Sequence, residues 1–305
     1  MSHPFGVGRA LVVGDANPDL LLSGDVVPRF GQSEQEVEAA FALGGSAAIC
    51  AAALARLEVS VALAAAVGDD DLAAVVLARL EAAGVGCGAL QRSGAPTGLS
   101  VHLLHGDDRT ILTQIGAIRE LDVDAVCASI GQAEGLRHVH LASVYLVEPL
   151  LARGGAVVDA ARAAGAAASV DTGFDPAGEF AAPEWLRRAD VLLLNATEAM
   201  RLAGADDVDA AATSLGSAGA TVVVKLGADG AVVEGERVPA PQAERVVDAV
   251  GAGDAFDAGF IRGRLDGLSA RDAAALGCAC GTLSLRAAGA DGQATLGEAR
   301  GLVAR

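Results

Sequence analysis

The stretch Arg245-Val-Val-Asp248-Ala-Val-Gly251-Ala-Gly253-Asp254-Ala-Phe-Asp-Ala-Gly-Phe260 has the pattern of a short strand, a glycine turn and a helix. Its first valines favour an extended chain, and the apolar residues after Asp254 recur at helical spacing. Backbone N–H groups at the start of a helix are unpaired and carry the positive end of the helix dipole. Because glycine lets a ligand approach the backbone closely, residues 251–253 predict a cradle for a phosphate group.

Asp254 falls in the first turn of this predicted helix, where its side chain faces whatever the cradle holds. A carboxylate in that place can accept the proton of a hydroxyl group that attacks a phosphoryl group. An aspartate that caps an ordinary helix would give the same local pattern. The stretch alone leaves both interpretations open, and the rest of the chain has to decide between them.

The composition limits the partners of the chain. Its 305 residues suit one large α/β domain or two modest ones, and with 52% hydrophobic but only 3% aromatic residues the core must be aliphatic. The net charge of −17 argues against a nucleic-acid partner. Because Lys225 is the only lysine, an anionic ligand must be held mainly by arginine, backbone N–H groups or a metal ion.

The cysteines and the N-terminus indicate a cytoplasmic protein. The five cysteines are odd in number and form no CxxC pair, so the sequence favours buried thiols over a zinc site or disulfides. The N-terminus lacks the charged and apolar regions of a signal peptide. The longest uncharged run, residues 39–55, is mostly alanine and glycine and predicts a buried turn and helix. We therefore expect no membrane partner.

The first half of the chain alternates strands with helices, which predicts a parallel sheet. Residues 10–14 form a short apolar strand, and Asn17 and Asp19 follow it at the place where open α/β sheets bind ligands. The sequence Asn-Pro-Asp also suits a simple turn. Gly44-Gly45-Ser46 then opens a predicted helix that runs to about residue 57, followed by a strand over 59–67 and a helix over 72–83.

Residues 97–118 break this alternation, because two strands there flank a Gly-Asp-Asp turn. We expect this hairpin to pair with the irregular stretch 20–41 as a small lid over the strand ends. His102 and His105 on the hairpin have no third ligand nearby, and we interpret them, like His138 and His140, as solvated or core histidines.

The second half returns to regular alternation without a repeat or a linker. Predicted strands cover residues 138–146, 167–171, 189–194 and 221–226. Predicted helices cover residues 154–164, 255–265, 270–287 and 296–303, and a further helix begins after Asn195. The acidic cluster 69–71 predicts a helix cap.

Five motifs occur in one order and at one spacing: Asn17-x-Asp19, Gly44-Gly45, Asn195-x-x-Glu198, Lys225-Leu-Gly227-x-x-Gly230 and Asp248-x-x-Gly251-Ala-Gly253-Asp254. Together they resemble the ribokinase (PfkB) family of carbohydrate and nucleoside kinases over essentially the whole chain. The resemblance implies an α/β fold, a ribokinase-like three-layer sandwich with a mainly parallel central sheet and a small β lid. It also implies a single kinase domain over residues 1–305, with lid segments at about 20–41 and 97–118.

The resemblance assigns roles around the phosphoryl group and the sugar. Asp254 would be the catalytic base, and Gly251, Ala252 and Gly253 would be the anion hole that stabilises the transferring group. The residues implied for the sugar hydroxyl groups are Asn17, Asp19, Gly44, Gly45 and Ser46. Phosphoryl transfer needs positioning and electrostatic stabilisation, which backbone N–H groups and magnesium supply in a chain with a single lysine.

The resemblance also implies ATP and Mg²⁺ as cofactors. Asn195 and Glu198 would organise magnesium and phosphate, Glu198 largely through water. The residues implied at the border of the nucleotide are Lys225, Gly227 and Gly230. Members of the family often bind a monovalent cation beside the anion hole. Asp248 and the loop 287–292 match that region, so the resemblance admits K⁺ there.

The chain departs from the family pattern in ways that leave the sugar open. Ala249 stands where the family usually has Thr, and Ile49 stands where an Asn after Gly-Gly is common, so ribose is not implied. Arg109 on the lid hairpin is either a substrate contact or an exposed lid arginine. Tyr145, the only tyrosine, is either a substrate contact or a core residue.

Other functions fit the sequence less well. A nucleoside kinase of the same fold would stack the base on aromatic groups, of which the chain has few. A dinucleotide-binding oxidoreductase needs the third glycine of GxGxxG, and a P-loop NTPase needs Gly-Lys-Ser/Thr, and both are absent. A sugar-binding homologue without catalysis has no need for Asp254.

The sequence therefore predicts an ATP-dependent sugar kinase that transfers the γ-phosphoryl group to a hydroxymethyl group of a small sugar or polyol. Because lid hairpins in this family can pair between subunits, a homodimer through the lid is compatible with the resemblance.

Overall fold

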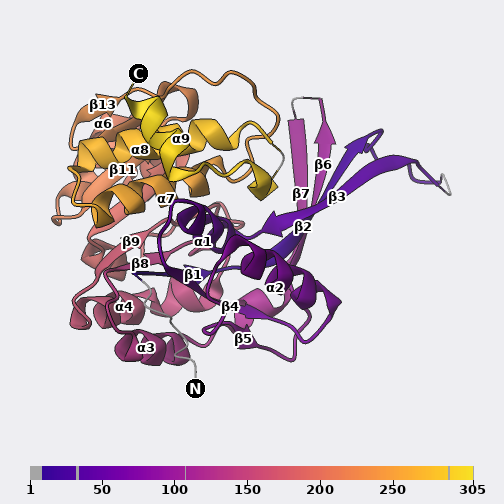
Figure 1. The fold of residues 1–305 in the computed structure, drawn as a ribbon, viewed down its shortest axis with the longest axis horizontal. Helices are drawn as coiled ribbons and strands as arrows, with labels where there is room; N and C mark the ends of the chain where they lie inside the picture. Colours follow the sequence, from indigo (N-terminus) through magenta and orange to yellow (C-terminus); the bar gives the residue numbers. More distant parts are fainter. Residues whose placement is uncertain (1–8, 32–33, 107, 288, 305) are drawn as a thin grey trace.

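A nine-stranded sheet runs through the computed structural model, which describes residues 9–31, 34–106, 108–287 and 289–304 (Figure 1). Its strands are β1 (Ala10–Gly14), β4 (Val61–Val67), β5 (Gln91–Arg92), β8 (His138–Leu141), β9 (Ala167–Val170), β10 (Val191–Asn195), β11 (Thr221–Lys225), β12 (Ala231–Val233) and β13 (Glu236–Val238). They lie in the order β13-β12-β11-β10-β9-β8-β1-β4-β5. Neighbours from β11 to β5 run parallel, and β12 and β13 add an antiparallel edge.

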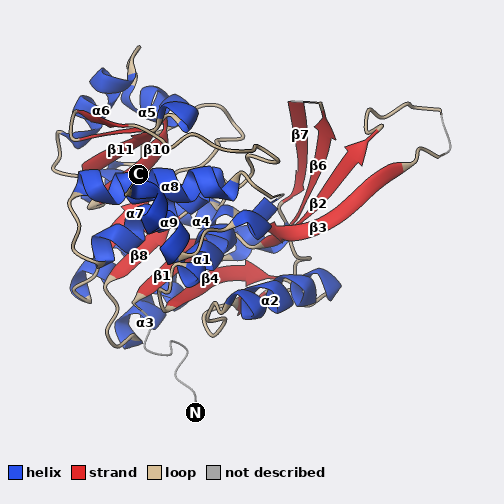
Figure 2. Ribbon diagram, turned by 45° about the horizontal axis from the view of Figure 1, so that its top comes forward, coloured by secondary structure: helices blue, strands red, loops and turns tan. Residues whose placement is uncertain are grey.

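Helices cover both faces of this sheet, as Figure 2 shows. On one face lie α1 (Ser46–Arg56), α2 (Asp71–Ala83), α7 (Ala252–Leu265), α8 (Ala270–Ser284) and α9 (Leu296–Val303). On the other lie α3 (Val123–Gln132), α4 (Glu148–Ala163), α5 (Ala196–Ala203) and α6 (Val208–Gly216). Strand β1 is therefore buried on both sides. Its residues Ala10 and Val12 pack on the face covered by α1 and α7, and Leu11 and Val13 pack on the face covered by α3 and α4. The predicted three-layer sandwich is confirmed.

The chain order places a ligand site beside β1. In the sheet, β1 has β4 on one side and β8 on the other. The chain adds β4 and β5 toward one edge of the sheet, and from β8 onward it adds strands toward the opposite edge. Parallel sheets bind ligands at the carboxyl ends of their strands where the order reverses in this way. Residues that follow β1 and β8 therefore meet at the same edge of the sheet.

A second, four-stranded sheet projects from this edge as the lid (Figure 1). Its strands are β2 (Asn17–Gly24), β3 (Val37–Gly44), β6 (Leu99–His105) and β7 (Asp108–Gln114), in the order β3-β2-β6-β7. The predicted hairpin is thus confirmed as β6 and β7. The prediction that residues 20–41 are irregular was wrong at both ends, because β2 and β3 pair over eight residues each. Residues 32 and 33 lie outside the described residues.

Several other elements differ from the sequence predictions. The strand expected over residues 138–146 ends at Leu141, because Ser143 takes a left-handed backbone conformation with φ 54°. The helix expected from residue 154 begins at Glu148, with Pro149 in its first turn. Helices α3 and α6 were missed, although Asp122 and Asp207 cap their first turns. The four short 3₁₀ turns are η1 (Gly116–Glu120), η2 (Glu184–Arg188), η3 (Gly227–Asp229) and η4 (Gly289–Gly292).

Two sequence predictions about local chemistry are confirmed. Asp70 caps α2 through Ala73 N–H, and its carboxylate also accepts hydrogen bonds from Thr97. All five cysteines are free thiols; three of them are buried as predicted, whereas Cys87 and Cys127 are only half-buried. Among the described residues, the helices are too short or too polar for one of them to span a bilayer.

Small residues let α7 approach α8 closely. A Cβ atom on Gly259 would lie 2.8 Å from the backbone oxygen of Leu276 and 2.9 Å from Cα of Gly277. A Cβ atom on Gly263 would lie 2.8 Å from Cα of Ala273. Backbone atoms cannot move aside as a flexible side chain can, so glycine is required at this contact. The packing fixes the position of α7 and of the residues at its N-terminus.

We expect Gly259→Ala to lower the free energy of unfolding by about 1–3 kcal/mol, as overpacking does in cores. The clash outweighs the gain of about 0.5–1 kcal/mol that alanine brings to a helix interior. Urea unfolding measures the difference. Gly297→Ala is the matched control, because that helical glycine has open space around its Cβ position. Equal stability of Gly259→Ala and the native protein would contradict the packing argument.

Candidate active site

The N-terminus of α7 borders a cavity of about 820 Å³ at the carboxyl edge of the central sheet. Gly251, with φ 76°, is the N-cap residue, and no side chain caps this helix. Gly251, Ala252, Gly253 and Asp254 all line the cavity. An uncapped helix N-terminus presents N–H groups and the positive end of the helix dipole, so the predicted phosphate cradle is suited to an anion.

Asp254 lies in the first turn of α7, and the Ser46 hydroxyl group donates a hydrogen bond to its carboxyl group. Desolvation and the nearby Asp171 carboxylate raise the pKa of Asp254 to about 8. A carboxyl group with a raised pKa that lies beside a cavity is suited to take a proton from a bound hydroxyl group.

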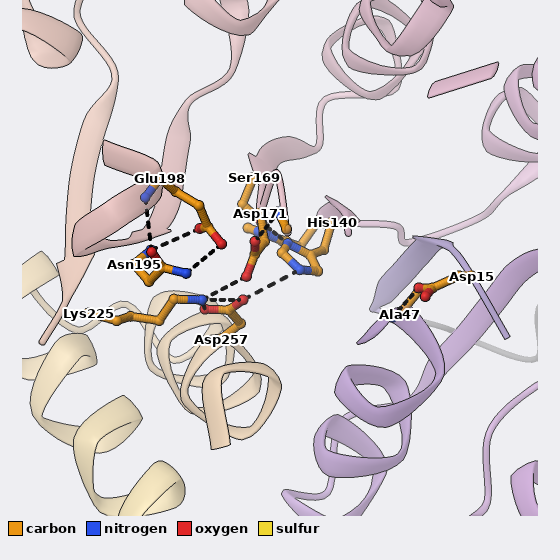
Figure 3. A network of polar contacts seen from close by, with 11 residues as sticks. Asp15, Ala47, His140, Ser169, Asp171, Asn195, Glu198, Lys225 and Asp257 are labelled. Atoms are coloured by element: carbon orange, nitrogen blue, oxygen red, sulfur yellow. Dashed lines mark hydrogen bonds and ion pairs between the residues drawn. The ribbon is translucent and has the colours of Figure 1, made fainter. Parts of the chain in front are cut away.

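Lys225 joins α7 to the ends of two strands, as Figure 3 shows. Its ammonium nitrogen lies 2.7 Å from Oδ2 of Asp171 and 3.0 Å from Oδ1 of Asp257. Although burial opposes the charge, Asp171 and Asp257 raise the pKa of Lys225 well above its usual value. Burial raises the pKa of Asp257, which is 1% exposed. Burial also acts to raise the pKa of Asp171, but Lys225 outweighs this effect and lowers the pKa to about 2. Lys225 and Asp171 are therefore charged.

The histidines of β8 continue this polar cluster below the cavity. His138 Nε2 and His140 Nδ1 lie 2.7 and 2.8 Å from the Ser169 hydroxyl group, and His140 Nε2 lies 3.9 Å from Oδ2 of Asp257. Burial lowers the pKa of His138 to about 3 and that of His140 to about 4, so both are neutral. They are core histidines, as predicted. Within the ranges that the structure describes, no three His, Cys, Asp or Glu side chains form a metal cluster.

Asn195 and Glu198 line the cavity beside Lys225. Asn195 ends β10 and caps α5, because its side-chain oxygen accepts the N–H group of Glu198 at 2.9 Å. In return, the Glu198 carboxylate accepts the backbone N–H group of Asn195 at 2.9 Å. Burial and the Asp171 carboxylate raise the pKa of Glu198 to about 7. A desolvated carboxylate at the wall of a cavity is stabilised by a cation, so Glu198 fits a role beside hydrated magnesium.

The sugar-binding candidates Asn17 and Asp19 lie where β1 passes into the lid. Asn17 Nδ2 donates to Oδ1 of Asp19 at 2.9 Å and to the Ser100 hydroxyl group at 3.2 Å. Oδ2 of Asp19 lies 3.2 Å from His102 Nε2. Gly44 lies against Asp19, whose carboxylate occupies the space of a Cβ atom at residue 44. These groups form one cluster at the base of the lid.

Gly45 and Ser46 begin α1, which is held in place by a residue that the sequence interpretation missed. Asp15 directly follows β1, and its Oδ1 accepts the Ala47 N–H group at 3.1 Å. It also accepts a hydrogen bond from Ser143 after β8, and its burial raises its pKa. Its position just past a strand was the available signal. Asp15 therefore ties the start of α1 to the strand ends.

Gly227 and Gly230, which the resemblance implies for the nucleotide, also line the cavity. Gly230, with φ 89°, has the Val238 backbone oxygen in the space of a Cβ atom. Much of the remaining cavity wall is apolar and comes from residues that no motif had indicated: Phe174, Ala240, Pro241, Val246, Cys278, Thr282 and Leu285. An apolar wall suits the flat base of a nucleotide.

The structure does not bring Tyr145 and Asp248 to the cavity wall. The Tyr145 hydroxyl group donates to the Ala181 carbonyl at 2.9 Å, and its ring packs edge-on against Phe180 at 5.7 Å between centroids. Protein contacts thus satisfy Tyr145 and disfavour its predicted role as a sugar ligand. The two carboxylate oxygens of Asp248 accept N–H groups of Val250 and Gly289, each at 2.9 Å. Asp248 therefore links the turn before α7 to η4.

Comparisons with known proteins agree with this geometry. The model of the pfkB family of carbohydrate kinases matches residues 8–295. The chain is 34% identical, over 292 residues, to an ATP-dependent ribose-1-phosphate kinase of Halopiger xanaduensis, which covers 92% of this chain and 93% of that protein.

Solved structures with the same fold include Arabidopsis thaliana ribokinase complexed with ribose and ATP. It matches with a TM-score of 0.82 and 23% identity over 97% of this chain and 98% of that one. An Escherichia coli protein described as ribokinase II, in complex with ATP and Mg²⁺, matches with a TM-score of 0.80 and 21% identity over 98% and 99% of the two chains. The family match spans nearly the whole sequence, and the protein therefore belongs to the PfkB family of carbohydrate kinases, phosphotransferases that act on a sugar hydroxyl group.

Proposed function

We propose that the protein transfers the γ-phosphoryl group of ATP to a hydroxymethyl group of a small sugar, with Asp254 as the catalytic base. One observation carries the proposal: Asp254 and the uncapped turn at Gly251–Gly253 line the same cavity as Glu198 and Lys225. A base, an anion cradle and a cation-binding carboxylate are the groups that phosphoryl transfer requires.

Each residue near the acceptor has a separate role in the proposed phosphoryl transfer. Asp254 accepts the proton of the attacking hydroxyl group, and Ser46 orients its carboxylate. The N–H groups of residues 251–253 hold the charge that develops on the transferring phosphoryl group. Asn17, Asp19, Gly44 and Gly45 form the site for the sugar, at the base of the lid.

On the nucleotide side, Gly227 and Gly230 border the phosphates and the ribose. Asn195 and Glu198 would hold hydrated Mg²⁺, which would supply positive charge to the nucleotide phosphates. Lys225 adds a fixed positive charge beside Gly253, whose Cβ position lies 3.6 Å from the lysine nitrogen. The loop around Asp248 and η4 is the site for K⁺, next to the anion hole.

A nucleoside kinase is the second candidate within the family. Phe174 favours it, because this aromatic ring lines the cavity and is 76% exposed. A nucleoside base would stack on it. A panel of sugars, sugar acids, sugar phosphates and nucleosides, assayed for ADP release, decides between the two acceptors.

We expect Asp254→Asn to lower kcat by about 10²–10⁴-fold, the usual contribution of a general base, while sugar binding persists. ADP release and calorimetric titration with the sugar measure the two effects. Because the base must be ionised, kcat/KM of the native enzyme should rise with pH and level off above about pH 8. Activity of the variant within tenfold of the native enzyme would contradict the assignment of the base.

We expect substitutions of the two carboxylates beside Lys225 to have non-additive effects on the free energy of unfolding. Asp171→Asn and Asp257→Asn each leave one carboxylate that can ionise beside Lys225, so each single change should cost little stability. The double variant leaves a buried ammonium group without a counter-charge and should lower the free energy of unfolding by about 3–5 kcal/mol. Urea unfolding of the four proteins gives the coupling. Additive effects on the free energy of unfolding would contradict the argument that either carboxylate can balance the charge of Lys225.

The outer face of the lid supports a proposed homodimer. Val37, Phe41 and Leu112 lie on this face and are 37%, 47% and 58% exposed. We expect a dimer in light-scattering chromatography, and a monomer for Phe41→Glu/Leu112→Glu, because two buried charges oppose an apolar interface. The control is Phe30→Glu, a fully exposed residue outside the lid strands. A native monomer at micromolar concentration would exclude this interface.

A further inference from the structure

The inner face of the lid carries a row of polar groups that ends in an arginine. Direct pairing places Asp19, Ser100 and Thr113 side by side at the base of the lid. The same face includes Thr113, Ile111 and Arg109, because side chains alternate along β7. Ser100 contacts both Asn17 and Thr113 at 3.2 Å, which shows that this is the face turned toward the sugar site.

Arg109 extends from this row to the cavity. It lines the cavity together with Ser46 and Asp254. It lies four residues from Thr113 along β7, about 13 Å at 3.4 Å per residue, and therefore nearer the tip of the lid. A sugar bound at Asn17 and Asp19, as proposed above, would lie against the same face of the lid as Arg109.

The guanidinium group of Arg109 differs from the other cation of the cavity in having no counter-charge. The cationic residues in the cavity wall are Arg109 and Lys225. Lys225 is neutralised by Asp171 and its contact with Asp257. For Arg109, the structure records no hydrogen bond or ion pair to any residue within the described ranges, so its five donors remain for a ligand.

The charge of the remaining site makes this arginine significant. The sugar end holds the carboxyl group of Asp19, and the whole chain has a net charge of −17. Such surroundings repel an anion unless a cation is placed to meet it. A neutral sugar has no use for an unpaired guanidinium group, whereas a phosphate or carboxylate accepts two parallel hydrogen bonds from it.

We infer that the acceptor sugar already carries an anionic group, a phosphate or a carboxylate, and that Arg109 on the inner face of the lid binds it. The inference rests on the proposed kinase function and adds the class of its acceptor. Arg109 is then the residue that selects anionic over neutral sugars, while Asp254 performs the chemistry on the hydroxymethyl group at the other end.

The test compares the native enzyme, Arg109→Gln and Arg109→Lys on three acceptors: an aldopentose, its 1-phosphate and the corresponding aldonic acid. We expect native kcat/KM to be at least about 30-fold higher on one anionic acceptor, and Arg109→Gln to abolish most of that preference. Arg109→Lys should retain part of it, because a lysine keeps the charge without the paired geometry. The phosphate and acid arms identify which anion the site takes.

Arg29→Gln is the matched control, because it removes a positive charge from the loop between β2 and β3 at a residue outside the cavity wall. It should leave the preference intact. A fall in activity caused by a higher KM for ATP, with the acceptor preference retained, would assign Arg109 to the nucleotide and overturn the inference.

A binding measurement separates this inference from the kinase proposal. In calorimetry with Asp254→Asn, which lacks the base, the anionic acceptor should bind, and adding Arg109→Gln should weaken binding at least about 30-fold. Failure of both anionic sugars to bind overturns the inference even if neutral sugars are phosphorylated. Binding without turnover in the native enzyme supports the inference and rejects the kinase proposal.

Discussion

The ion cluster around Lys225 is the interaction on which the active-site geometry depends. A buried ammonium group needs a counter-charge, and here Asp171 at the end of β9 and Asp257 in α7 surround it at the end of β11. The cluster therefore ties two strand ends to the helix that carries Asp254. Since Asp257 lies one turn beyond Asp254, the same contact also fixes the rotation of α7 about its axis.

Close packing by small residues complements this polar contact. The core contains few aromatic residues, and glycine and alanine allow α7 to lie against α8 at backbone distance. Gly259 and Gly263 face α8, whereas Gly251 opens the helix and Gly253 lies in its first turn beside the cavity. Glycines thus serve two purposes in one helix, close packing at one end and access for an anion at the other.

The sequence predicted much of the fold because its signals are local. The glycine turn before Asp254, the strand before Asn17 and the glycine pair before α1 each lie within a few residues of the element that they start. The two helices that the sequence analysis missed, α3 and α6, have capping aspartates but little else to distinguish them from loops. The strand after His138 ended early because Ser143 adopts a conformation that residue type alone does not indicate.

The candidate site was harder to predict where it depends on distant contacts. Lys225 reaches Asp171 across 54 residues and Asp257 across 32, and no local pattern relates them. Tyr145 illustrates the opposite case, because the sequence left it open as a substrate contact or a core residue, whereas in the fold it contacts Ala181 and Phe180. Motifs indicate which residues gather at a sheet edge, but burial and pairing decide what each side chain contacts.

The way the lid is attached has a consequence for water. Strand β2 begins at Asn17 and β3 ends at Gly44, so the two sugar-site segments are the roots of the lid rather than separate loops. Any rotation of the lid sheet about this edge also moves Asp19, and a ligand that fixes Asp19 restrains the rotation. If these segments bind the sugar as proposed, sugar recognition and the exclusion of solvent from Asp254 are coupled mechanically, and this coupling would protect ATP from hydrolysis while the acceptor is absent.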